Sequence, residues 1–490
     1  MRNEIHLREA GSSTITDWHN QEKTALKLIS LVGDLRFDRA IEIVIFRRSI
    51  YDSRPSELIQ HHEVSINYTG HPIEVGDTYE IVRCIAAIQD LAPAKLDVGI
   101  LAIEWSQEGT NYATMTDFVS DKLMGFRGDD KHNPEPRDVV LYGFGRIGRL
   151  LARRMIELTG SGDQLLLKAI VLRAKMPDII SEVQKRMALL LEDSIHGTFH
   201  GTVEVSNGGR EVIINGNRVA LIFADNPSEI DYSEYGISNA VLIDNTGVWR
   251  DNTGLSQHIR PGISRVLLTA PGKDVPNIVH GVNQAIVSGD DHKVLSAASC
   301  TTNAIVPIIK VLNDSLGISS GHIETIHSYT SDQNLLDNFH KKPRRGRAAA
   351  VNMVLTTTGA AKAVAKVLPE LAGKLTGNSV RVPTPNVSLA IISVEVKSDT
   401  TAEEVNSLLR EASLHGELVE QIHYSASTEF VSSHAVGMTT TSVLDAPSTI
   451  VSPDGRHVNI YAWYDNEYGY ACQVVRLAKH VAAVRRYTYY

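Results

Sequence analysis

The sequence has only three cysteines in 490 residues, Cys84, Cys300 and Cys472, and they lie far apart. An odd number without paired spacing argues against a disulfide framework and for a reducing cytoplasm. No uncharged run is long enough to span a bilayer, and the polar first residues, 1–13, lack the apolar core of a signal peptide. The net charge of −9 provides no general basic face, so we expect neither nucleic acid nor a membrane as partner.

The chain is 43% hydrophobic and 21% charged, and its length suggests about three domains. Up to about residue 135, apolar residues recur at three- and four-residue spacing in 22–35, 38–52 and 75–92, which predicts helices. The adjacent His61 and His62 would point to different faces of a helix, so we expect no metal pair there. Residues 125–138 are polar and rich in glycine and proline, as in a linker. We therefore expect a helical N-terminal extension, 1–135, with a structural or interaction role.

After the linker, short β-rich runs alternate with helical stretches, the pattern of a doubly wound α/β fold. We assign residues 136–299 to a Rossmann dinucleotide-binding domain, completed by a C-terminal helix over 467–490. Longer strands and loops follow from about residue 321. We therefore assign residues 300–466 to an α+β catalytic domain.

A glycine-rich loop joins the strand 139–142 to a helical stretch. It reads Gly143, Phe144, Gly145, Arg146, Ile147, Gly148. Glycines at this spacing allow a tight turn and close approach of a pyrophosphate to free N–H groups at the helix start. The alternative is an ordinary turn between strand and helix. We interpret the loop as a cofactor site.

The second strand of this domain ends at Leu172 and Arg173. An NAD-specific site usually places Asp or Glu there, to accept hydrogen bonds from the ribose hydroxyls. Without that carboxylate a 2′-phosphate is not repelled, and Arg173 offers a positive charge to bind it. In the competing interpretation, Arg173 is only a solvated residue at the strand end. The sequence is therefore compatible with NAD, with NADP or with both.

Cys300 lies between a strand-like run and a helical run, where a helix N-terminus favours the thiolate. Lowering a thiol pKa from about 8.5 to about 6 requires roughly 3.4 kcal/mol. A helix terminus supplies about 0.3–1 kcal/mol, so a second partner is needed. His327, downstream at a strand end, is our candidate base.

Several blocks of this sequence resemble the glyceraldehyde-3-phosphate dehydrogenase family. They are the cofactor loop at Gly143, SerAlaAlaSerCysThrThrAsn around Cys300, ThrGlyAlaAlaLysAla from Thr358, ArgValProThrProAsn from Arg381 and TrpTyrAspAsnGlu from Trp463. The resemblance covers about residues 137–490.

This resemblance implies a phosphorylating enzyme that oxidises glyceraldehyde 3-phosphate to 1,3-bisphosphoglycerate through a Cys300 thioester, reversibly, in glycolysis or gluconeogenesis. It implies His327 as the base, with Thr330 and Arg381 on the substrate phosphate. Ser299, Thr301, Thr358 and Gly359 would hold the co-substrate, inorganic phosphate. Thr246, Gly247 and Thr269 would line the cofactor groove, and Asn466 would hold the nicotinamide carboxamide. No metal is implied.

The segment 329–355 resembles the family's S-shaped loop beside a neighbouring subunit's cofactor, so a homo-oligomer, typically a tetramer, is implied. Asn338 and Phe339 stand where many NAD-using members have a Leu-Pro pair. The basic run 341–347 lacks interleaved aromatic residues, which favours a subunit contact or a phosphate-facing role over nucleic-acid binding. Two rival functions stay open, a dehydrogenase for erythrose 4-phosphate and a non-catalytic scaffold that keeps the fold.

Overall fold

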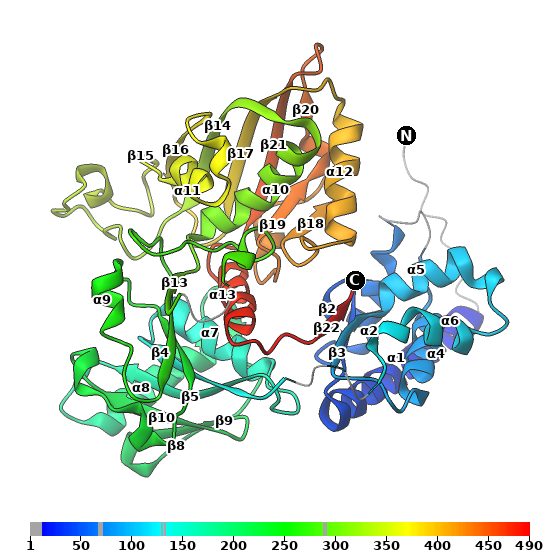
Figure 1. The fold of residues 1–490 in the computed structure, drawn as a ribbon, viewed down its shortest axis with the longest axis horizontal. Helices are drawn as coiled ribbons and strands as arrows, with labels where there is room; N and C mark the ends of the chain where they lie inside the picture. The colour runs from blue at the N-terminus through cyan, green and yellow to red at the C-terminus, as the bar shows by residue number, and fades with distance from the viewer. Residues whose placement is uncertain (1–11, 67–71, 129–130, 132–133, 288–291) are drawn as a thin grey trace. The chain divides into compact units, whose positions relative to one another are not determined.

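The computed structural model describes residues 12–66, 72–128, 131, 134–287 and 292–490, and it divides into two compact units. The first unit combines residues 1–135 with 485–490, and the second spans 136–484. Part of the expected linker, 129–130 and 132–133, lies outside the described residues, as do residues 1–11 of the polar N-terminus. Figure 1 shows the chain coloured from its N-terminus to its C-terminus.

The first unit contains helices around a small sheet of order β2-β1-β3-β22. Strand β3 is parallel to both of its neighbours, whereas β2 is antiparallel to β1. The helices are α1 (Ser12–Arg39), α2 (Pro55–Glu63), α4 (Val75–Ala87), α5 (Val98–Glu108) and α6 (Met115–Lys122). The strands are β1 (Glu42–Ile45), β2 (Arg48–Ser49), β3 (Ala94–Asp97) and β22 (Tyr487–Tyr489).

The helices predicted over 22–35 and 75–92 correspond to α1 and α4, but the helix predicted over 38–52 is wrong. That segment forms β1 and β2, joined by a turn in which Phe46 and Arg47 have positive φ angles of 46° and 66°. The buried carboxylate of Asp97 fixes this turn by accepting 2.8 Å hydrogen bonds from both backbone N–H groups. A short β-branched run fits a buried parallel strand as well as a helix face, which explains the error.

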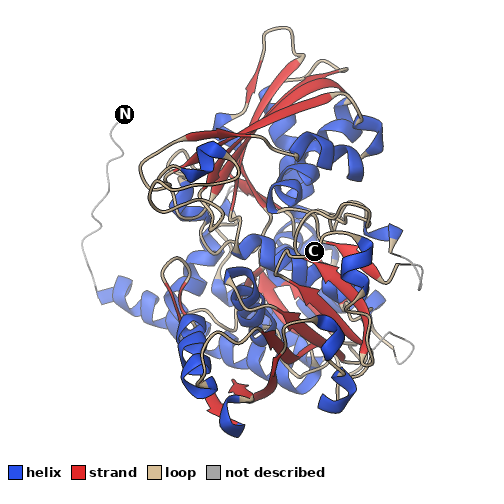
Figure 2. Cartoon of the chain, turned by 90° about the vertical axis from the view of Figure 1, so that its left-hand side faces the viewer, coloured by secondary structure: helices blue, strands red, loops and turns tan. Residues whose placement is uncertain are grey.

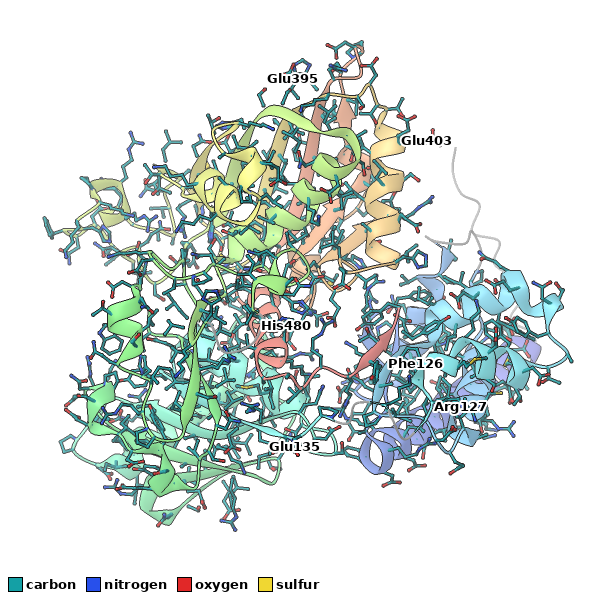
Figure 3. All side chains as sticks on the ribbon, viewed as in Figure 1. Phe126, Arg127, Glu135, Glu395, Glu403 and His480 are labelled. Carbon is teal, nitrogen blue, oxygen red and sulfur yellow. The ribbon has the colours of Figure 1, made fainter. Side chains whose placement is uncertain are left out.

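The C-terminal helix also ends earlier than predicted. Helix α13 (Tyr468–Val481) packs in the core of the second unit, whereas β22 pairs with β3 of the first unit. Phe126, labelled in Figure 3, contacts the rings of Tyr487 and Tyr489 at centroid distances of 6.1 and 6.0 Å. Residues 485–490 therefore belong to the first unit, not to the helix that completes the cofactor domain.

The cofactor half of the second unit is an eight-stranded sheet of order β13-β12-β11-β4-β5-β10-β9-β8. Its six strands from β13 to β10 are parallel, and β9 and β8 extend it as antiparallel strands. The strands are β4 (Arg137–Tyr142), β5 (Leu165–Leu172), β8 (Val203–Ser206), β9 (Glu211–Ile214), β10 (Asn217–Phe223), β11 (Ala240–Asp244), β12 (Ile263–Leu268) and β13 (Val294–Ser296). The helices are α7 (Arg146–Glu157), α8 (Ile179–Leu191) and α9 (Asn252–Ser256), and a two-stranded sheet pairs β6 (Glu192–Asp193) with β7 (Gly197–Thr198).

Helices α7 and α13 join one core cluster with the side chains of β4, β5, β10 and β11. Leu150, Leu151, Val474 and Leu477 are essentially inaccessible to solvent. A fully buried side chain of this size contributes roughly 1.5–3 kcal/mol to stability. The core therefore holds the glycine-rich loop before α7 and the polar residues before α13 in fixed positions.

The catalytic half is a mixed sheet of order β15-β16-β14-β17-β21-β19-β18, with β20 paired to β21. Figure 2 shows this sheet and the cofactor sheet in red with their helices in blue. The strands are β14 (Ile318–Ser328), β15 (Val354–Thr356), β16 (Leu375–Val382), β17 (Ser388–Val396), β18 (Ile422–Ser425), β19 (Ser442–Asp445), β20 (Ile450–Val451) and β21 (His457–Tyr464). The helices are α10 (Cys300–Leu316), α11 (Ala360–Val367) and α12 (Ala402–Leu414). Ile305, Ile308, Ile309 and Leu312 of α10 lie in the core of this half, which fixes the start of the helix relative to the sheet.

Candidate active site

Cys300 is the first residue of α10, directly after the N-cap residue Ser299. Ser299 Oγ accepts a 3.0 Å hydrogen bond from Thr302 N, which satisfies one of the free donors at the helix start. Asn303 Nδ2 donates back to Ala297 O at 2.7 Å and to Ser299 O at 3.0 Å. The loop before the helix is thus fixed from both sides, and the Cys300 thiol is held in one place.

His327 faces the thiol from the end of β14. Its Nε2 lies 3.8 Å from Cys300 Sγ, and its Nδ1 lies 2.7 Å from Ser328 O. A carbonyl oxygen can only accept, so the proton of the neutral ring is on Nδ1. The lone pair of Nε2 is therefore directed at the thiol, as a base requires.

Burial dominates the protonation of both groups. It raises the pKa of the Cys300 thiol above its ordinary value, although Arg381 and hydrogen bonds from Thr301 act in the opposite direction. Burial, reinforced by Arg381, lowers the pKa of His327 to about 3. Each group alone therefore favours its neutral form, unlike the thiolate expected at a helix start. An ion pair at 3.8 Å would gain about 4 kcal/mol at an effective dielectric constant near 20, which works against this penalty once the proton moves.

Arg381 lies beside His327 because β14 and β16 are parallel and these two residues are in register. Its Nη1 donates to Ser328 O at 3.0 Å and to Thr330 Oγ1 at 3.3 Å. Its buried Nε has no hydrogen-bond partner in the described part of the chain. The guanidinium is thus positioned by two bonds and keeps a donor for an anionic ligand.

Asn466, which follows β21, is buried and has a fixed amide orientation. Its Oδ1 accepts 2.9 Å hydrogen bonds from the hydroxyls of Ser328 and Ser388. Because the oxygen is occupied twice, the NH₂ group is the part left to donate to a ligand.

These side chains share one cavity of about 730 Å³. Ten of the residues predicted for the site line it: Arg146, Ile147, Thr246, Thr269, Ser299, Cys300, His327, Thr330, Arg381 and Asn466. Thr301 does not; it is buried and its hydroxyl is 3.0 Å from Tyr464 Oη. Thr358 and Gly359 also lie outside the lining, before α11, where Thr358 Oγ1 accepts from Ala360 N at 3.1 Å.

The glycine-rich loop has the shape that a dinucleotide needs. Gly143 has a φ of 101°, and a Cβ there would come within 2.8 Å of the Thr246 methyl group. A Cβ on Gly148 would come within 2.7 Å of both Asn245 Oδ1 and Gly143 O, whereas a Cβ on Gly145 would extend into open space. The first and third glycines therefore serve close packing, and the second leaves room above the helix start for a pyrophosphate.

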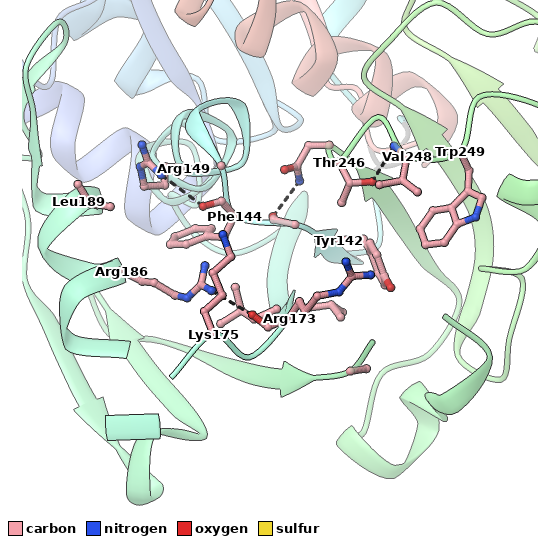
Figure 4. Close-up of a pocket in the computed structure, with 16 residues that line it drawn as sticks. Tyr142, Phe144, Arg149, Arg173, Lys175, Arg186, Leu189, Thr246, Val248 and Trp249 are labelled. Carbon is pink, nitrogen blue, oxygen red and sulfur yellow. Dashed lines mark hydrogen bonds between the residues drawn. The ribbon is translucent and has the colours of Figure 1, made fainter. Parts of the chain in front are cut away.

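A second cavity, of about 520 Å³, lies on the other side of this loop and shares Thr246 with the first. Gly143, Phe144, Gly145, Leu172 and Arg173 line it, as expected for the adenosine end of a cofactor site (Figure 4). Gly148 and Gly247 are in the lining of neither cavity. One cavity therefore contains Cys300 and the other Leu172, with Thr246 in the lining of both.

Sequence reasoning predicted Arg146 but missed the residues that hold it and the segment after Asn466 in place, which are Asp193, Glu467, Asp465 and His196. Arg146 is paired with Asp193 at 3.1 Å and with Glu467, so its guanidinium links the cofactor loop to the residue after Asn466. Asp465 accepts from the backbone of Glu467 and Tyr468 at 2.9 Å and lies 3.1 Å from His196. These partners come from distant parts of the sequence, so no local motif identifies them.

The described residues contain no group of three His, Cys, Asp or Glu side chains placed to hold a metal. Within the described ranges, no helix is long and apolar enough to cross a membrane.

Comparison with known proteins agrees with this geometry. The sequence profile "Glyceraldehyde 3-phosphate dehydrogenase, NAD binding domain" matches residues 137–252, and the profile of the C-terminal domain matches residues 299–466. A nucleotide-binding Rossmann half and a catalytic half with a cysteine and a histidine define the class, an NAD(P)-dependent oxidoreductase. The chain belongs to the glyceraldehyde-3-phosphate dehydrogenase family.

The relatives differ in how much of the chain they match. A "glyceraldehyde-3-phosphate dehydrogenase-like protein" of Pseudomonas aeruginosa (strain UCBPP-PA14) is 47% identical over 464 residues, 93% of this chain and 98% of that protein. Glyceraldehyde-3-phosphate dehydrogenase 2 of Bacillus subtilis (strain 168) is 40% identical over 351 residues, 70% of this chain and 96% of its own. Glyceraldehyde-3-phosphate dehydrogenase 2 of Trichormus variabilis (strain ATCC 29413 / PCC 7937) is 41% identical over 345 residues, which cover 70% of this chain and 98% of that protein. The similarity to the Pseudomonas protein therefore extends into the N-terminal unit.

Proposed function

We propose that this protein is a phosphorylating glyceraldehyde-3-phosphate dehydrogenase that forms 1,3-bisphosphoglycerate reversibly, in glycolysis or gluconeogenesis. One observation carries the proposal. Cys300 Sγ lies 3.8 Å from the unprotonated Nε2 of His327, in a cavity that also contains Arg381 and the amide of Asn466. Oxidation of a phosphorylated aldehyde requires such a set: a nucleophile, its base, an anion-binding group and a fixed amide.

The chemistry follows from this pair. As Cys300 Sγ adds to the aldehyde carbon, its proton moves to His327 Nε2 and then to the new alkoxide, giving a thiohemiacetal. His327 Nε2 next takes the hydroxyl proton while the carbon loses a hydride, and the C=O bond forms again as a thioester. An oxygen of inorganic phosphate then attacks the acyl carbon, the C–S bond breaks, and Cys300 leaves as thiolate, which takes its proton back from His327 Nε2.

Two groups of residues serve the two phosphates. Arg381 and Thr330 are joined by a 3.3 Å hydrogen bond and bind the phosphate of the substrate. Ser299 and Thr301 at the start of α10, with Thr358 and Gly359 before α11, hold the attacking phosphate. The support is strongest for the first group, because both of its residues line the cavity.

The cofactor is NAD or NADP, which accepts the hydride when bound. The residues fit such a group, since a Cβ at Gly143 or Gly148 would collide with neighbouring atoms and Gly145 leaves space. Asn466, whose NH₂ group is left to donate, would hold the nicotinamide carboxamide and so set the ring face that accepts the hydride.

The protein acts as a homotetramer in the cytoplasm. In the segment 329–355 the side chains of Leu335, Leu336, Phe339, Val351 and Met353 are each 73–88% exposed, which supports burial against another subunit. Arg345 and Arg347 of the basic run form ion pairs with Asp332 and Asp337. The three cysteines are free, in keeping with a reducing compartment.

The test is an assay of the purified full chain with glyceraldehyde 3-phosphate, with and without inorganic phosphate, followed by the absorbance of the reduced nicotinamide. Cys300→Ser should abolish product formation, and Cys84→Ser, in the N-terminal unit, should not change it. Parallel assays with erythrose 4-phosphate decide the substrate. Full activity of Cys300→Ser, or no turnover of either aldehyde, would refute the proposal.

A further inference from the structure

The adenosine cavity contains an excess of positive charge. Four cationic residues line it, Arg149, Arg173, Lys175 and Arg186, and no Asp or Glu does (Figure 4). Uncharged adenine and ribose do not need four cations, and the pyrophosphate is served by the helix start beside Gly145. The cavity is therefore built for a further anion at its adenosine end.

Arg173, the residue that the sequence suggests for this role, is engaged elsewhere. Its Nε is 3.3 Å from Asp225 Oδ1, and its Nη2 donates to Asp225 O at 3.1 Å. Both side chains are largely exposed, 62% and 80%. In Figure 4 its guanidinium lies toward Tyr142, away from Lys175 and Arg186. The guanidinium of Arg173 is thus held at the exposed carboxylate of Asp225, on the Tyr142 side of the cavity.

Arg149 lies at the glycine-rich loop and not at the end of β5: its Nη1 donates to Phe144 O at 3.3 Å, and its buried Nε has no hydrogen-bond partner among the described residues. That leaves Lys175 and Arg186. Among the described residues, neither Lys175 Nζ nor Arg186 Nη1 has a hydrogen-bond partner. Lys175 extends toward Phe144, and Arg186 points across the cavity floor toward it (Figure 4).

One buried carboxylate, Glu182, fixes both residues. Its Oε2 accepts from the backbone of Lys175 at 2.8 Å and of Met176 at 2.9 Å. Its Oε1 accepts from Arg186 Nε at 2.9 Å, and Arg186 Nη2 also donates to Arg173 O at 3.1 Å. Arg186 is only 19% exposed and Glu182 only 4%. The guanidinium is therefore held rigidly, with Nη1 free, at the end of β5.

Leu172 completes the argument, because it is 2% exposed and ends β5 at this cavity. In dinucleotide-binding folds a carboxylate near this place holds the ribose hydroxyls, and an arginine nearby accommodates a 2′-phosphate. Here a buried leucine takes the position of the carboxylate, and two cationic side chains lie beside it. Lys175 offers its Nζ, and Arg186, although it is paired with Glu182, keeps Nη1 for a ligand.

We propose that Lys175 Nζ and the guanidinium of Arg186 bind the 2′-phosphate of NADP, so that these two residues, and not Arg173, determine cofactor preference. This inference rests on the dinucleotide orientation in the proposed function. It names residues of α8 and of the loop before it that carry no recognisable motif.

The test is calorimetric titration of the purified full chain with adenosine 2′,5′-bisphosphate and with 5′-AMP, which share adenosine but differ in the 2′-phosphate. We expect wild type to bind the bisphosphate at least about tenfold more tightly, the effect of one charge-assisted hydrogen bond. Lys175→Ala and Arg186→Gln should each remove most of that advantage and leave 5′-AMP binding unchanged. Lys185→Ala is the matched control on α8, because its Nζ lies 3.9 Å from Met176 Sδ and not in the cavity lining.

The outcomes separate this inference from the proposed function. Equal affinity of wild type for the two nucleotides would overturn it, as would loss of discrimination in Arg173→Ala but not in Lys175→Ala. Inorganic phosphate competing equally against both nucleotides would show a general anion site, and would also overturn it. If the protein binds the bisphosphate more tightly than 5′-AMP but oxidises no aldehyde, the inference is supported and the proposed function is refuted. Thermal unfolding of each variant shows that lost binding is not lost folding.

Discussion

Each unit of this protein buries a histidine, and the two illustrate different uses of burial. His62 on α2 of the first unit has both ring nitrogens occupied, by Leu58 O and Thr78 Oγ1, each at 2.7 Å. His327 in the second unit has one nitrogen occupied and the other directed at a thiol in a cavity. Burial lowers the pKa of His62 to about 4 and that of His327 to about 3. The shifts are similar, so it is the nitrogen directed at the thiol and the cavity, not the pKa, that distinguish the proposed base His327 from His62.

The largest effect should follow from removing the base. His327→Asn should reduce turnover by about 10³-fold, in the range that general bases contribute, with little change in thermal stability. Steady-state kinetics and a melting curve on the same preparation measure both. Near-normal turnover would mean that His327, like His62, has only a structural role.

Arg381→Ala should lower kcat/KM for glyceraldehyde 3-phosphate by about 10²-fold, because roughly two charge-assisted hydrogen bonds to a dianion are lost. Unphosphorylated glyceraldehyde serves as the control substrate and should be affected much less. Equal losses on both aldehydes would show that Arg381 only supports Ser328 O and the loop before Thr330.

His62 of the first unit should affect the stability of the protein and not its turnover. His62 has a folded-state pKa of about 4 against an ordinary 6.5. Its neutral form therefore stabilises the fold fully above about pH 6.5, and this contribution falls as the pH drops toward 4. The full shift corresponds to about 3 kcal/mol at most.

This loss would be measured by urea unfolding, followed by tryptophan fluorescence. The variants used carry Trp105 as their only tryptophan, so that the signal comes from the first unit. The matched variant His62→Gln should weaken the dependence on pH while leaving turnover at pH 8 near wild type. A first unit whose stability is unchanged between pH 7 and 5 would contradict the assignment of His62 as a neutral buried group.

The smallest effect should come from Ser388→Ala, which removes one of the two hydroxyls on Asn466 Oδ1. With Ser328 still in place, we expect about a five- to tenfold rise in KM for the cofactor and a smaller change in kcat, as for one neutral hydrogen bond. A variant in which kcat falls and KM does not would show that the hydroxyl acts on chemistry and not on cofactor binding.

The sequence predicted residues of the second unit better than those of the first because the second unit uses local motifs. The loop from Gly143 and the helix start at Cys300 each combine shape and chemistry in a few consecutive residues. As predicted, the first joins the strand β4 to the helix α7, and Cys300 begins the helix α10. Lys175 and Arg186 were missed because Glu182, seven residues from the first and four from the second, orients them through contacts that only the folded loop creates. In the first unit, the strand β1 was taken for a helix because its neighbour β3 lies about 50 residues further along the chain.

The pairing of β22 with β3 has a consequence for synthesis on the ribosome. Tyr489 Oη donates to Glu104 Oε2 at 2.5 Å across a separation of 385 residues. The sheet of the first unit therefore stays incomplete, with one edge of β3 unpaired, until the whole second unit has been translated. Contacts of such sequence separation form slowly and leave an open edge in the meantime. The unit that emerges first is thus the one that finishes folding last, and a fusion that displaces residues 487–489 would leave it permanently unfinished.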